Sequence, residues 1–266
     1  HMSGLNAGRW DYLFSMIKVF RDRGIEFLIP DRGQVAMTAP MMRAYTDLLV
    51  QTCHKRGAFA IGGMAAFVPS RKDENINKIA FEKVRADKVR EAGDGFDGSW
   101  VAHPDLVAVC KEVFDGALGE QPNQLQKLRP EVSIKASDLL AVSKTPGVIT
   151  QEGLRLNIDV SLQYLAAWLA GNGAVAIHNL MEDAATVEIS RSQIWQQVKN
   201  KVVYADTSQV ASAELVREIL EKESERLIAS GWDRQKIAQA SELFERVSLA
   251  DEYADFLTLP ALEMID

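Results

Sequence analysis

The spacing of apolar residues predicts helices and a strand in the first part of the chain. After Pro40, apolar residues recur every three or four positions until Arg56-Gly57, a basic residue and a glycine of the kind that end helices. The stretch 58–61 that follows is a continuous apolar run, as expected for a parallel strand that is buried on both faces. Similar patterns predict a helix or buried segment over 12–20, helices over 72–93 and 106–118, and a short strand over 99–102.

The character of the sequence changes near residue 120. The alternation of helix and strand before this point is typical of parallel β/α architecture, whereas strand patterns nearly vanish after it. The segment 121–130 is polar and bounded by proline, as a linker would be. The helices predicted beyond it cover 154–169, 187–198, 213–228 and 234–247. The sequence therefore predicts a β/α domain over 3–120, a linker over 121–130 and an all-helical domain over 131–266.

The β/α part is too short to close a barrel by itself. A closed (β/α)8 barrel takes about 250 residues. The first 120 residues of this chain supply three or four predicted strands. Because exposed strand edges and uncovered apolar faces favour association, self-association through the edges of an open barrel is an expectation.

The composition narrows the possible partners. The chain has 266 residues, of which 47% are hydrophobic and 25% are charged, and its net charge is -7. Nucleic acids and anionic membranes both favour a basic surface, so neither is expected as a partner. No apolar run approaches the roughly 20 residues that span a bilayer. The two cysteines match no disulfide or metal pattern. A cytoplasmic location is therefore expected.

Two short segments carry residues that suit catalysis. Asp11 follows Gly8-Arg9-Trp10 just beyond a short apolar stretch, where barrel enzymes place working groups and where a carboxylate could bind Mg2+. Glu182-Asp183 is a pair of adjacent carboxylates before a predicted helix, and their mutual repulsion can give one of them an acid/base pKa. Both segments have a plainer interpretation, because aspartate is common at turns and acidic residues favour a helix N-terminus. The pattern alone leaves both interpretations open.

Four longer motifs, in order along the chain, resemble the malate synthase family in its shorter A-type. The motifs are Leu5-Asn6-Ala7-Gly8-Arg9-Trp10-Asp11-Tyr12, Ala60-Ile61-Gly62-Gly63-Met64-Ala65-Ala66, Gly98-Ser99-Trp100-Val101-Ala102-His103-Pro104 and Asn179-Leu180-Met181-Glu182-Asp183-Ala184-Ala185-Thr186. The similarity covers essentially the whole chain. It implies the C-terminal half of such an enzyme: an α/β part of a TIM (β/α)8 barrel, followed by an all-helical C-terminal plug.

The resemblance also implies roles for individual residues. Asp183 matches the catalytic acid/base, and Asp11 matches a carboxylate ligand of Mg2+. The other matches are the backbone of Gly8, Arg9 and Trp10 for the glyoxylate carboxylate, Trp100 and Met181 for the substrate pocket, and His103 and Pro104 near the acetyl-CoA entrance. The implied reaction condenses acetyl-CoA with glyoxylate and hydrolyses the product to malate and CoA, a step of the glyoxylate cycle.

The resemblance also implies that parts of the site lie elsewhere. In the family, a catalytic arginine and a first Mg2+-binding glutamate come before the position of Gly8. We therefore expect this chain to be inactive or very weakly active alone, because positioning and electrostatic stabilisation would both be incomplete. Two alternatives stay open. One is a malyl-CoA or citramalyl-CoA lyase, which shares the barrel and the metal chemistry, and the other is a non-catalytic binding or assembly fragment.

Overall fold

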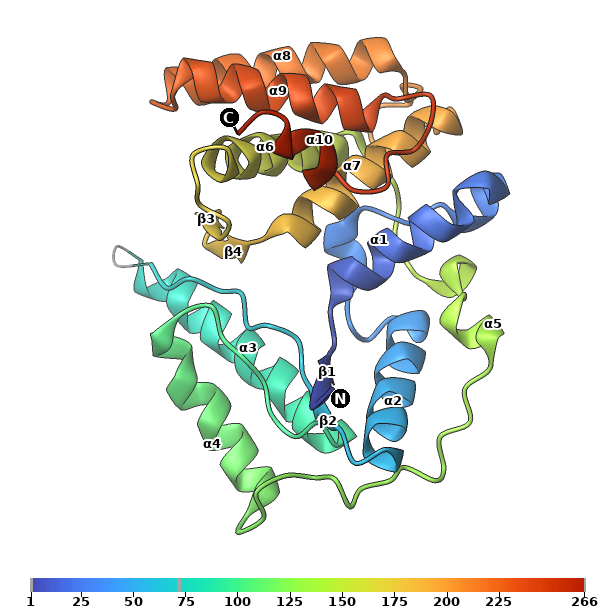
Figure 1. The fold of residues 1–266 in the computed structure, drawn as a ribbon, viewed down its shortest axis with the longest axis vertical. Helices are drawn as coiled ribbons and strands as arrows, with labels where there is room; N and C mark the ends of the chain where they lie inside the picture. Colours follow the sequence, from blue (N-terminus) through green and yellow to red (C-terminus); the bar gives the residue numbers. More distant parts are fainter. Residues whose placement is uncertain (1, 71–72, 266) are drawn as a thin grey trace. The chain divides into compact units, whose positions relative to one another are not determined.

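The computed structural model describes residues 2–70 and 73–265, which form two compact units (Figure 1). Unit 1 consists of the residues up to Arg9, residues 40–141 and residues 178–181. Unit 2 consists of residues 10–39, residues 142–177 and the residues from Glu182 onward. The units do not follow the order of the sequence, because 10–39 group with the later helices. The domain boundaries expected at residues 120 and 131 stay a prediction.

Unit 1 contains a short parallel sheet and the helices beside it. Its elements are β1 (Gly4–Asn6), α2 (Pro40–Lys55), β2 (Phe59–Ile61), α3 (Glu74–Asp94), the 3-10 turn η3 (Pro104–Leu106), α4 (Val107–Leu118) and α5 (Ala136–Leu139). β1 pairs in parallel with β2, and α3 packs against α4. Buried Leu49, Phe96 and Phe114 belong to the core of this unit. The helices predicted after Pro40 and over 106–118 and the strand over 58–61 are confirmed; residue 72, the predicted start of the helix that became α3, lies outside the described residues.

The predicted strand over 99–102 is wrong as a continuous element. Two isolated parallel bridges take its place, one from Gly98 to Ile61 at the end of β2 and one from Val101 to Ala65. Between these bridges the Gly63 N–H donates to Oε1 of Glu91 at 2.9 Å, and Nζ of Lys88 donates to the Gly63 carbonyl at 2.5 Å. Two side chains of α3 therefore occupy the backbone groups that a continuous ladder would need.

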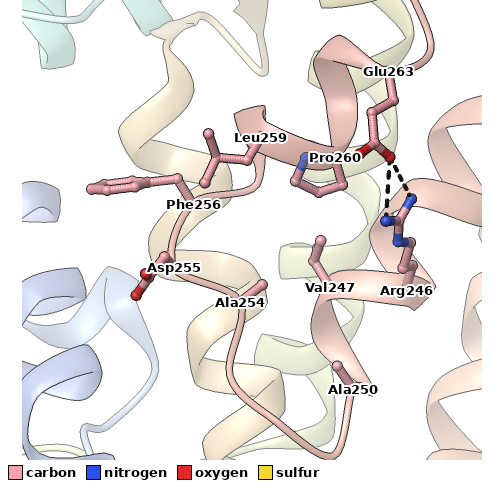
Figure 2. A pocket seen from close by; sticks show the side chains of 9 residues that line it. All are labelled: Arg246, Val247, Ala250, Ala254, Asp255, Phe256, Leu259, Pro260 and Glu263. Atoms are coloured by element: carbon pink, nitrogen blue, oxygen red, sulfur yellow. Dashed lines mark hydrogen bonds and ion pairs between the residues drawn. The ribbon is translucent and has the colours of Figure 1, made fainter.

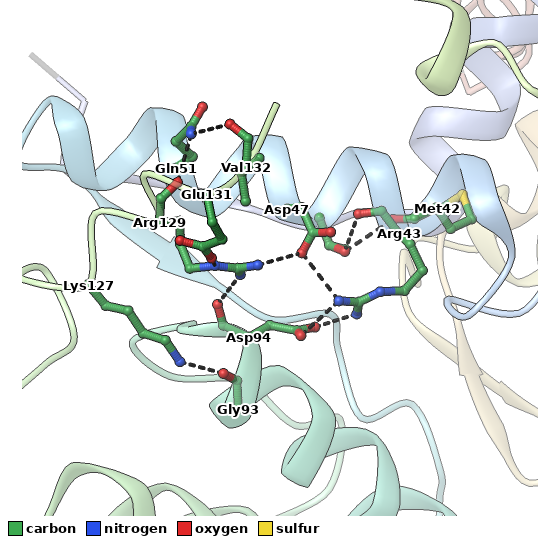
Figure 3. A network of polar contacts seen from close by, with 11 residues as sticks. Met42, Arg43, Asp47, Gln51, Gly93, Asp94, Lys127, Arg129, Glu131 and Val132 are labelled. Carbon is green, nitrogen blue, oxygen red and sulfur yellow. Dashed lines mark hydrogen bonds and ion pairs between the residues drawn. The ribbon is translucent and has the colours of Figure 1, made fainter. Parts of the chain in front are cut away.

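The segment predicted as a linker, 121–130, forms no helix or strand but is bound closely to unit 1 (Figure 3). The Arg129 guanidinium lies 3.2 Å from the Asp47 carboxylate and donates to the Asp94 carbonyl at 2.6 Å. Gln51 on α2 donates to the Arg129 carbonyl at 2.8 Å. Because these contacts join α2, α3 and the segment, the segment is part of the folded unit and not a free tether.

Unit 2 is built around the apolar stripe of one helix. Its elements are α1 (Arg9–Phe20), η1 (Arg21–Phe27), η2 (Arg32–Gln34), η4 (Val142–Lys144), α6 (Gln151–Trp168), β3 (Val175–Ile177), α7 (Ala184–Lys199), α8 (Ala213–Ala229), α9 (Arg234–Ser248) and α10 (Thr258–Leu262). β4 (Leu180–Glu182) begins in unit 1, and its last residue, Glu182, belongs to unit 2. α6 packs against α7, α8 and α9. Leu154, Ile158, Leu162 and Leu165 on α6 are fully buried, as their spacing predicts. The helices predicted in this part of the chain are confirmed.

Two short strands lie in the part of the chain that the sequence predicts to be all-helical. β3 and β4 are separated by His178 and Asn179, whose φ angles are 49° and 61°. Consecutive positive φ values are typical of the tight turns that join hairpin strands, and Asn and His tolerate them better than most residues. Runs of three residues are too short to show the period of a strand, which explains why the pattern did not predict them.

α7 buries an unusual number of polar side chains. Glu188 and Arg191 form an ion pair inside unit 2, with Oε2 of Glu188 2.7 Å from Nη2 of Arg191. The other carboxylate oxygen of Glu188 accepts from the Leu257 N–H at 2.8 Å. The Arg191 guanidinium also lies 4.4 Å from the centre of the Tyr253 ring. These contacts fix the C-terminal segment of unit 2 against α7.

The close approach at Gly62 gives a prediction for unit 1. A Cβ at Gly62 would lie 2.0 Å from the Glu91 carboxylate, which cannot move freely because Gly63 and Lys88 hold it. We expect Gly62→Ala to lower the free energy of unfolding by about 1–3 kcal/mol in urea denaturation. Gly98→Ala is the control, because nothing lies within 4 Å of the Cβ it would add. Equal stabilities of the two variants would contradict this account of Gly62.

The buried ion pair of α7 gives a prediction for unit 2. Glu188→Ala removes both the partner of Arg191 and the acceptor of the Leu257 N–H. An uncompensated buried charge typically costs about 3–5 kcal/mol, so we expect a loss of that size in chemical denaturation. Glu245→Ala is the matched control, since Glu245 pairs with Arg217 at the surface and exposed pairs contribute little. A Glu188 variant as stable as the Glu245 variant would show that the buried pair does not hold the C-terminal segment.

Candidate functional site

Asp183 is the N-cap residue of α7. Its Oδ1 accepts from the Ala185 N–H at 3.0 Å and from the Thr186 N–H at 3.4 Å. An N-cap carboxylate satisfies N–H groups that the first turn of a helix leaves without partners. Among the contacts of the described residues, Oδ2 takes part in no hydrogen bond. The side chain is half-buried and held by one oxygen, which leaves the other available for proton transfer.

Asp11 lies in the first turn of α1 and is electrostatically linked to Asp183. Its carboxylate remains accessible to solvent. The pKa of Asp11 is raised above its ordinary value, first by partial burial of the carboxyl group and then by the negative charge of Asp183. Unit 2 therefore brings these two carboxyl groups, which are 172 positions apart in the sequence (183 minus 11), into one neighbourhood.

Tyr164 on α6 is a third member of this neighbourhood. Burial and the charge of Asp183 raise its pKa to about 12, so the phenol keeps its proton over the physiological range. The hydroxyl donates to the Gly173 carbonyl at 2.9 Å. This bond anchors the loop that leads from α6 towards Asp183. The sequence analysis did not select Tyr164, because its position within the apolar stripe of α6 resembles that of a core residue.

Glu182 is buried and has a structural partner of its own. Its Oε2 accepts from the Thr186 hydroxyl at 2.5 Å. The sequence analysis considered Glu182 and Asp183 together as a capping cluster or an acid/base pair. In the structure only Asp183 caps the backbone of α7, while Glu182 is directed to a side chain one turn into the helix. The two adjacent carboxylates therefore differ in both burial and bonding.

Arg32 is a charged residue near this site that the sequence analysis missed. The side chain is buried, and its guanidinium carbon lies 5.1 Å from the centre of the Trp10 ring. Burial lowers the pKa of Arg32, whereas the charge of Glu182 raises it. The available signal was an arginine that follows the apolar run 27–29 and a Pro30-Asp31 turn. Like Asp11, it is a charged residue just beyond a short apolar run.

The predicted glyoxylate-binding segment is divided between the units. Gly8 and Arg9 lie in unit 1, one residue beyond the end of β1, and the Gly8 N–H donates to the Asn6 carbonyl at 3.2 Å. Trp10 begins the part of the chain that belongs to unit 2. The role of these three residues stays a prediction.

Trp100 and Met181 pair with neighbouring residues of unit 1. The Ala65 N–H donates to the Trp100 carbonyl at 2.9 Å, and the Met181 N–H donates to the Ala66 carbonyl at 2.7 Å. The indole of Trp100 is 46% exposed, and together with residues of β1 and β2 it lines an open pocket. An exposed indole at a pocket is compatible with the wall of a binding site, which is the role expected for Trp100.

His103 and Pro104 begin η3. Nδ1 of His103 accepts from the Asp105 N–H at 3.2 Å, which makes the imidazole the cap of this turn. Pro104 occupies the first position of the turn, where a missing N–H costs nothing. The structure thus gives both residues a local structural role, and their expected position near the acetyl-CoA entrance stays a prediction.

A second pocket lies in the C-terminal part of unit 2 (Figure 2). Its lining includes Phe256, Leu259 and Pro260, together with Arg246 and Glu263, which pair at 3.3 Å. None of the residues expected to act in catalysis or binding lines it. The pocket therefore adds nothing to the site around Asp11 and Asp183.

Over residues 2–70 and 73–265, no three or more His, Cys, Asp or Glu side chains gather closely enough to hold a metal ion as a group. Mg2+ commonly takes only one or two protein carboxylates and keeps several waters, so a site based on Asp11 needs no such group. Within the same residues, none of the helices has the length and apolarity to pass through a bilayer.

Comparison with known proteins gives a consistent assignment. The family model for "Malate synthase, TIM barrel domain" matches residues 1–142, and that for "Malate synthase, C-terminal" matches residues 148–265. The chain is 57% identical to the malate synthase of Streptomyces clavuligerus, covering 100% of this chain and 50% of that protein. It is 45% identical to malate synthase A of Escherichia coli and 46% identical to the glyoxysomal malate synthase of Gossypium hirsutum, covering 100% of this chain and 50% and 47% of those proteins.

These matches extend along the whole sequence, although the chain spans about half the length of the curated relatives it matches. The family models cover both the β/α part and the helical part, so the expected fold class is confirmed. The chain belongs to the malate synthase family.

Proposed function

We propose that this chain carries the acid/base carboxyl group and one metal-binding carboxylate of a malate synthase. The reaction condenses acetyl-CoA with glyoxylate and hydrolyses the product to malate and CoA. The observation that carries the proposal is the geometry of Asp183, which is fixed at the start of α7 through Oδ1 and keeps Oδ2 available. The names of the relatives and the two family matches support the same activity.

Asp183 is the base in this proposal. Oδ2 removes a proton from the methyl carbon of acetyl-CoA, and the resulting enolate attacks the aldehyde carbon of glyoxylate to form malyl-CoA. Hydrolysis of the thioester then releases malate and CoA. Because the helix N-terminus and the two backbone N–H groups hold Oδ1, the carboxylate is oriented before the substrate arrives.

Asp11 is the proposed Mg2+ ligand, and the electrostatics of the site are compatible with that role. Its carboxylate is accessible, and a second negative charge lies close enough to raise its pKa. A bound cation would offset the repulsion between the two carboxylates. When bound, Mg2+ would supply Lewis-acid polarisation of the aldehyde oxygen of glyoxylate.

The remaining residues are proposed to bind the substrates. The backbone of Gly8, Arg9 and Trp10 would hold the glyoxylate carboxylate, and Trp100 and Met181 would wall the substrate pocket. His103 and Pro104 would lie near the acetyl-CoA entrance. The exposed indole of Trp100 beside β1 and β2 supports the pocket assignment.

The match of residues 148–265 to the C-terminal model of malate synthases favours this activity over a malyl-CoA lyase. A cytoplasmic location is also a proposal. Relatives from Gossypium hirsutum and Zea mays are named glyoxysomal, so the family is not confined to one compartment. Self-association and the exclusion of nucleic acid and membrane as partners also stay predictions.

Two variants of Asp183 separate its structural role from its catalytic role. Asparagine caps helices about as well as aspartate, whereas alanine does not, so Asp183→Ala should lose about 1 kcal/mol of stability and Asp183→Asn only a few tenths. Both variants lack the base. With acetyl-CoA, glyoxylate and Mg2+ in D2O, we expect the wild-type chain, which should be very weakly active alone, to exchange methyl protons of acetyl-CoA for deuterium slowly but faster than the uncatalysed reaction. In both variants the exchange rate should fall by about 10²–10⁴-fold.

The exchange is followed by NMR and the stability by urea denaturation. If the Asp183→Asn variant exchanges protons at the wild-type rate, Asp183 is not the base. Absence of exchange by the wild-type chain would contradict the proposal that this chain carries the acid/base function.

A further inference from the structure

A series of hydrogen bonds through buried amide side chains fixes the Nε side of the Arg32 guanidinium. Its Nε donates to Oδ1 of Asn157 on α6 at 2.9 Å, and Asn157 Nδ2 donates to Oε1 of Gln193 on α7 at 3.1 Å. Gln193 in turn donates to the Pro30 carbonyl at 2.7 Å. The chain of bonds starts at Arg32, crosses two helices and returns to the segment just before Arg32. The guanidinium is therefore fixed in place before any ligand arrives.

Arg32 lies between the two segments that carry the candidate catalytic residues. Its guanidinium carbon is 5.1 Å from the centre of the Trp10 ring, and Trp10 directly precedes Asp11. The charge of Glu182, the residue before Asp183, also acts on Arg32. All of these residues belong to unit 2. Arg32 thus adds a cation to a neighbourhood that otherwise contributes carboxylates.

The edge of the guanidinium formed by Nη1 and Nη2 has no hydrogen-bond partner among the described residues. Among the contacts of the described residues, Nε is the Arg32 nitrogen that forms a hydrogen bond, and Nη1 and Nη2 form none. Neither Nη atom is fully buried, although Arg32 as a whole is only 7% exposed. Arg191 differs, because its Nη2 pairs with Glu188 and its Nη1 is sealed inside the protein. Arg191 is a structural arginine, whereas Arg32 presents two donors outward.

We propose that Arg32 is a substrate-binding residue whose Nη1–Nη2 edge receives a small carboxylate through two parallel N–H donors. The planar fork of arginine matches the two oxygens of a carboxylate, and the face of Trp10 shields one side of the pair from water. A carboxylate that approaches Asp11 and Asp183 is repelled by both, and the charge of Arg32 offsets that repulsion. The identification of this carboxylate as that of glyoxylate rests on the proposed function, whereas the binding of a small carboxylate does not.

The test compares two ligands that differ in charge. Glyoxylate and glycolaldehyde both carry an aldehyde, but only glyoxylate has a carboxylate. Dissociation constants for each are measured by NMR titration of the chain, with and without Mg2+. We expect Arg32→Lys to bind glyoxylate about tenfold more weakly and Arg32→Gln about a hundredfold more weakly, the range typical of charged hydrogen bonds. Binding of glycolaldehyde should change little, because this ligand has no carboxylate for the guanidinium to hold.

Arg21→Lys is the matched control, because Arg21 also belongs to unit 2 but bonds to the Lys18 carbonyl and lies over the Tyr253 ring instead of Trp10. It should bind glyoxylate like the wild type. Equal loss of both ligands in the Arg32 variants would identify a purely structural role and overturn the proposal. Wild-type affinity in Arg32→Gln, or no glyoxylate binding by the wild-type chain, would also overturn it.

If an Arg32 variant does not fold, Asn157→Ala replaces it. This variant keeps the guanidinium but releases its Nε, and it should weaken glyoxylate binding about threefold or more without affecting glycolaldehyde. Unchanged glyoxylate binding would contradict the proposal. These measurements follow ligand binding and not proton exchange, so they test Arg32 even if Asp183 is not the base. The proton-exchange test of Asp183→Asn has an outcome that is independent of them.

Discussion

The site depends on how the buried polar face of α7 is anchored in unit 2. Gln193 and Gln196 donate to the carbonyls of Pro30 and Phe27, each at 2.7 Å, and so fix the segment that ends in Arg32. Glu188 and Arg191 hold the C-terminal segment on another side of the same helix. Polar groups in a protein interior are costly unless each finds a partner, so this helix tolerates few alternative positions. The N-terminus of α7, and with it Asp183, is placed by these contacts.

The anchored helix also holds Asp183 where its charge acts on Asp11. Asp11 and Asp183 are close enough for the charge of one to raise the pKa of the other, which destabilises the fold when both are ionised. The cap bonds of Asp183 offset part of that cost, because a negative charge is favourable at a helix N-terminus. One carboxylate therefore serves both the stability of α7 and the proposed chemistry, and its two oxygens divide these tasks.

Much of this arrangement could be predicted from the sequence, because it depends on local patterns. The helical spacing from Leu154 to Leu165 predicts α6, and the acidic pair before 187–198 predicts both the start of α7 and a candidate acid/base. The resemblance to malate synthases predicts roles for Asp11 and Asp183, which stay predictions, whereas the family itself is shown by the two family matches.

The remaining features depend on contacts between distant residues. Arg32 differs from other arginines only because Asn157, 125 positions later, takes up its Nε. The strand predicted over 99–102 is interrupted because Lys88 and Glu91 occupy the backbone of Gly63. Residues 10–39 join the later helices through amides of α7, which no periodicity reveals. Such contacts leave no trace in the spacing of apolar residues, so the sequence alone could not predict them.

The central claim is that Asp11 and Asp183 share one electrostatic environment. The most direct test measures the pKa of Asp11 by carboxyl-resolved NMR in the wild-type chain and in Asp183→Asn. Removal of a neighbouring negative charge makes ionisation of Asp11 easier, so its pKa should fall in the variant. It should remain above the ordinary value of an aspartate, because burial is the larger cause of the shift. An Asp11 pKa that is the same in both proteins would show that the two carboxyl groups do not form one site.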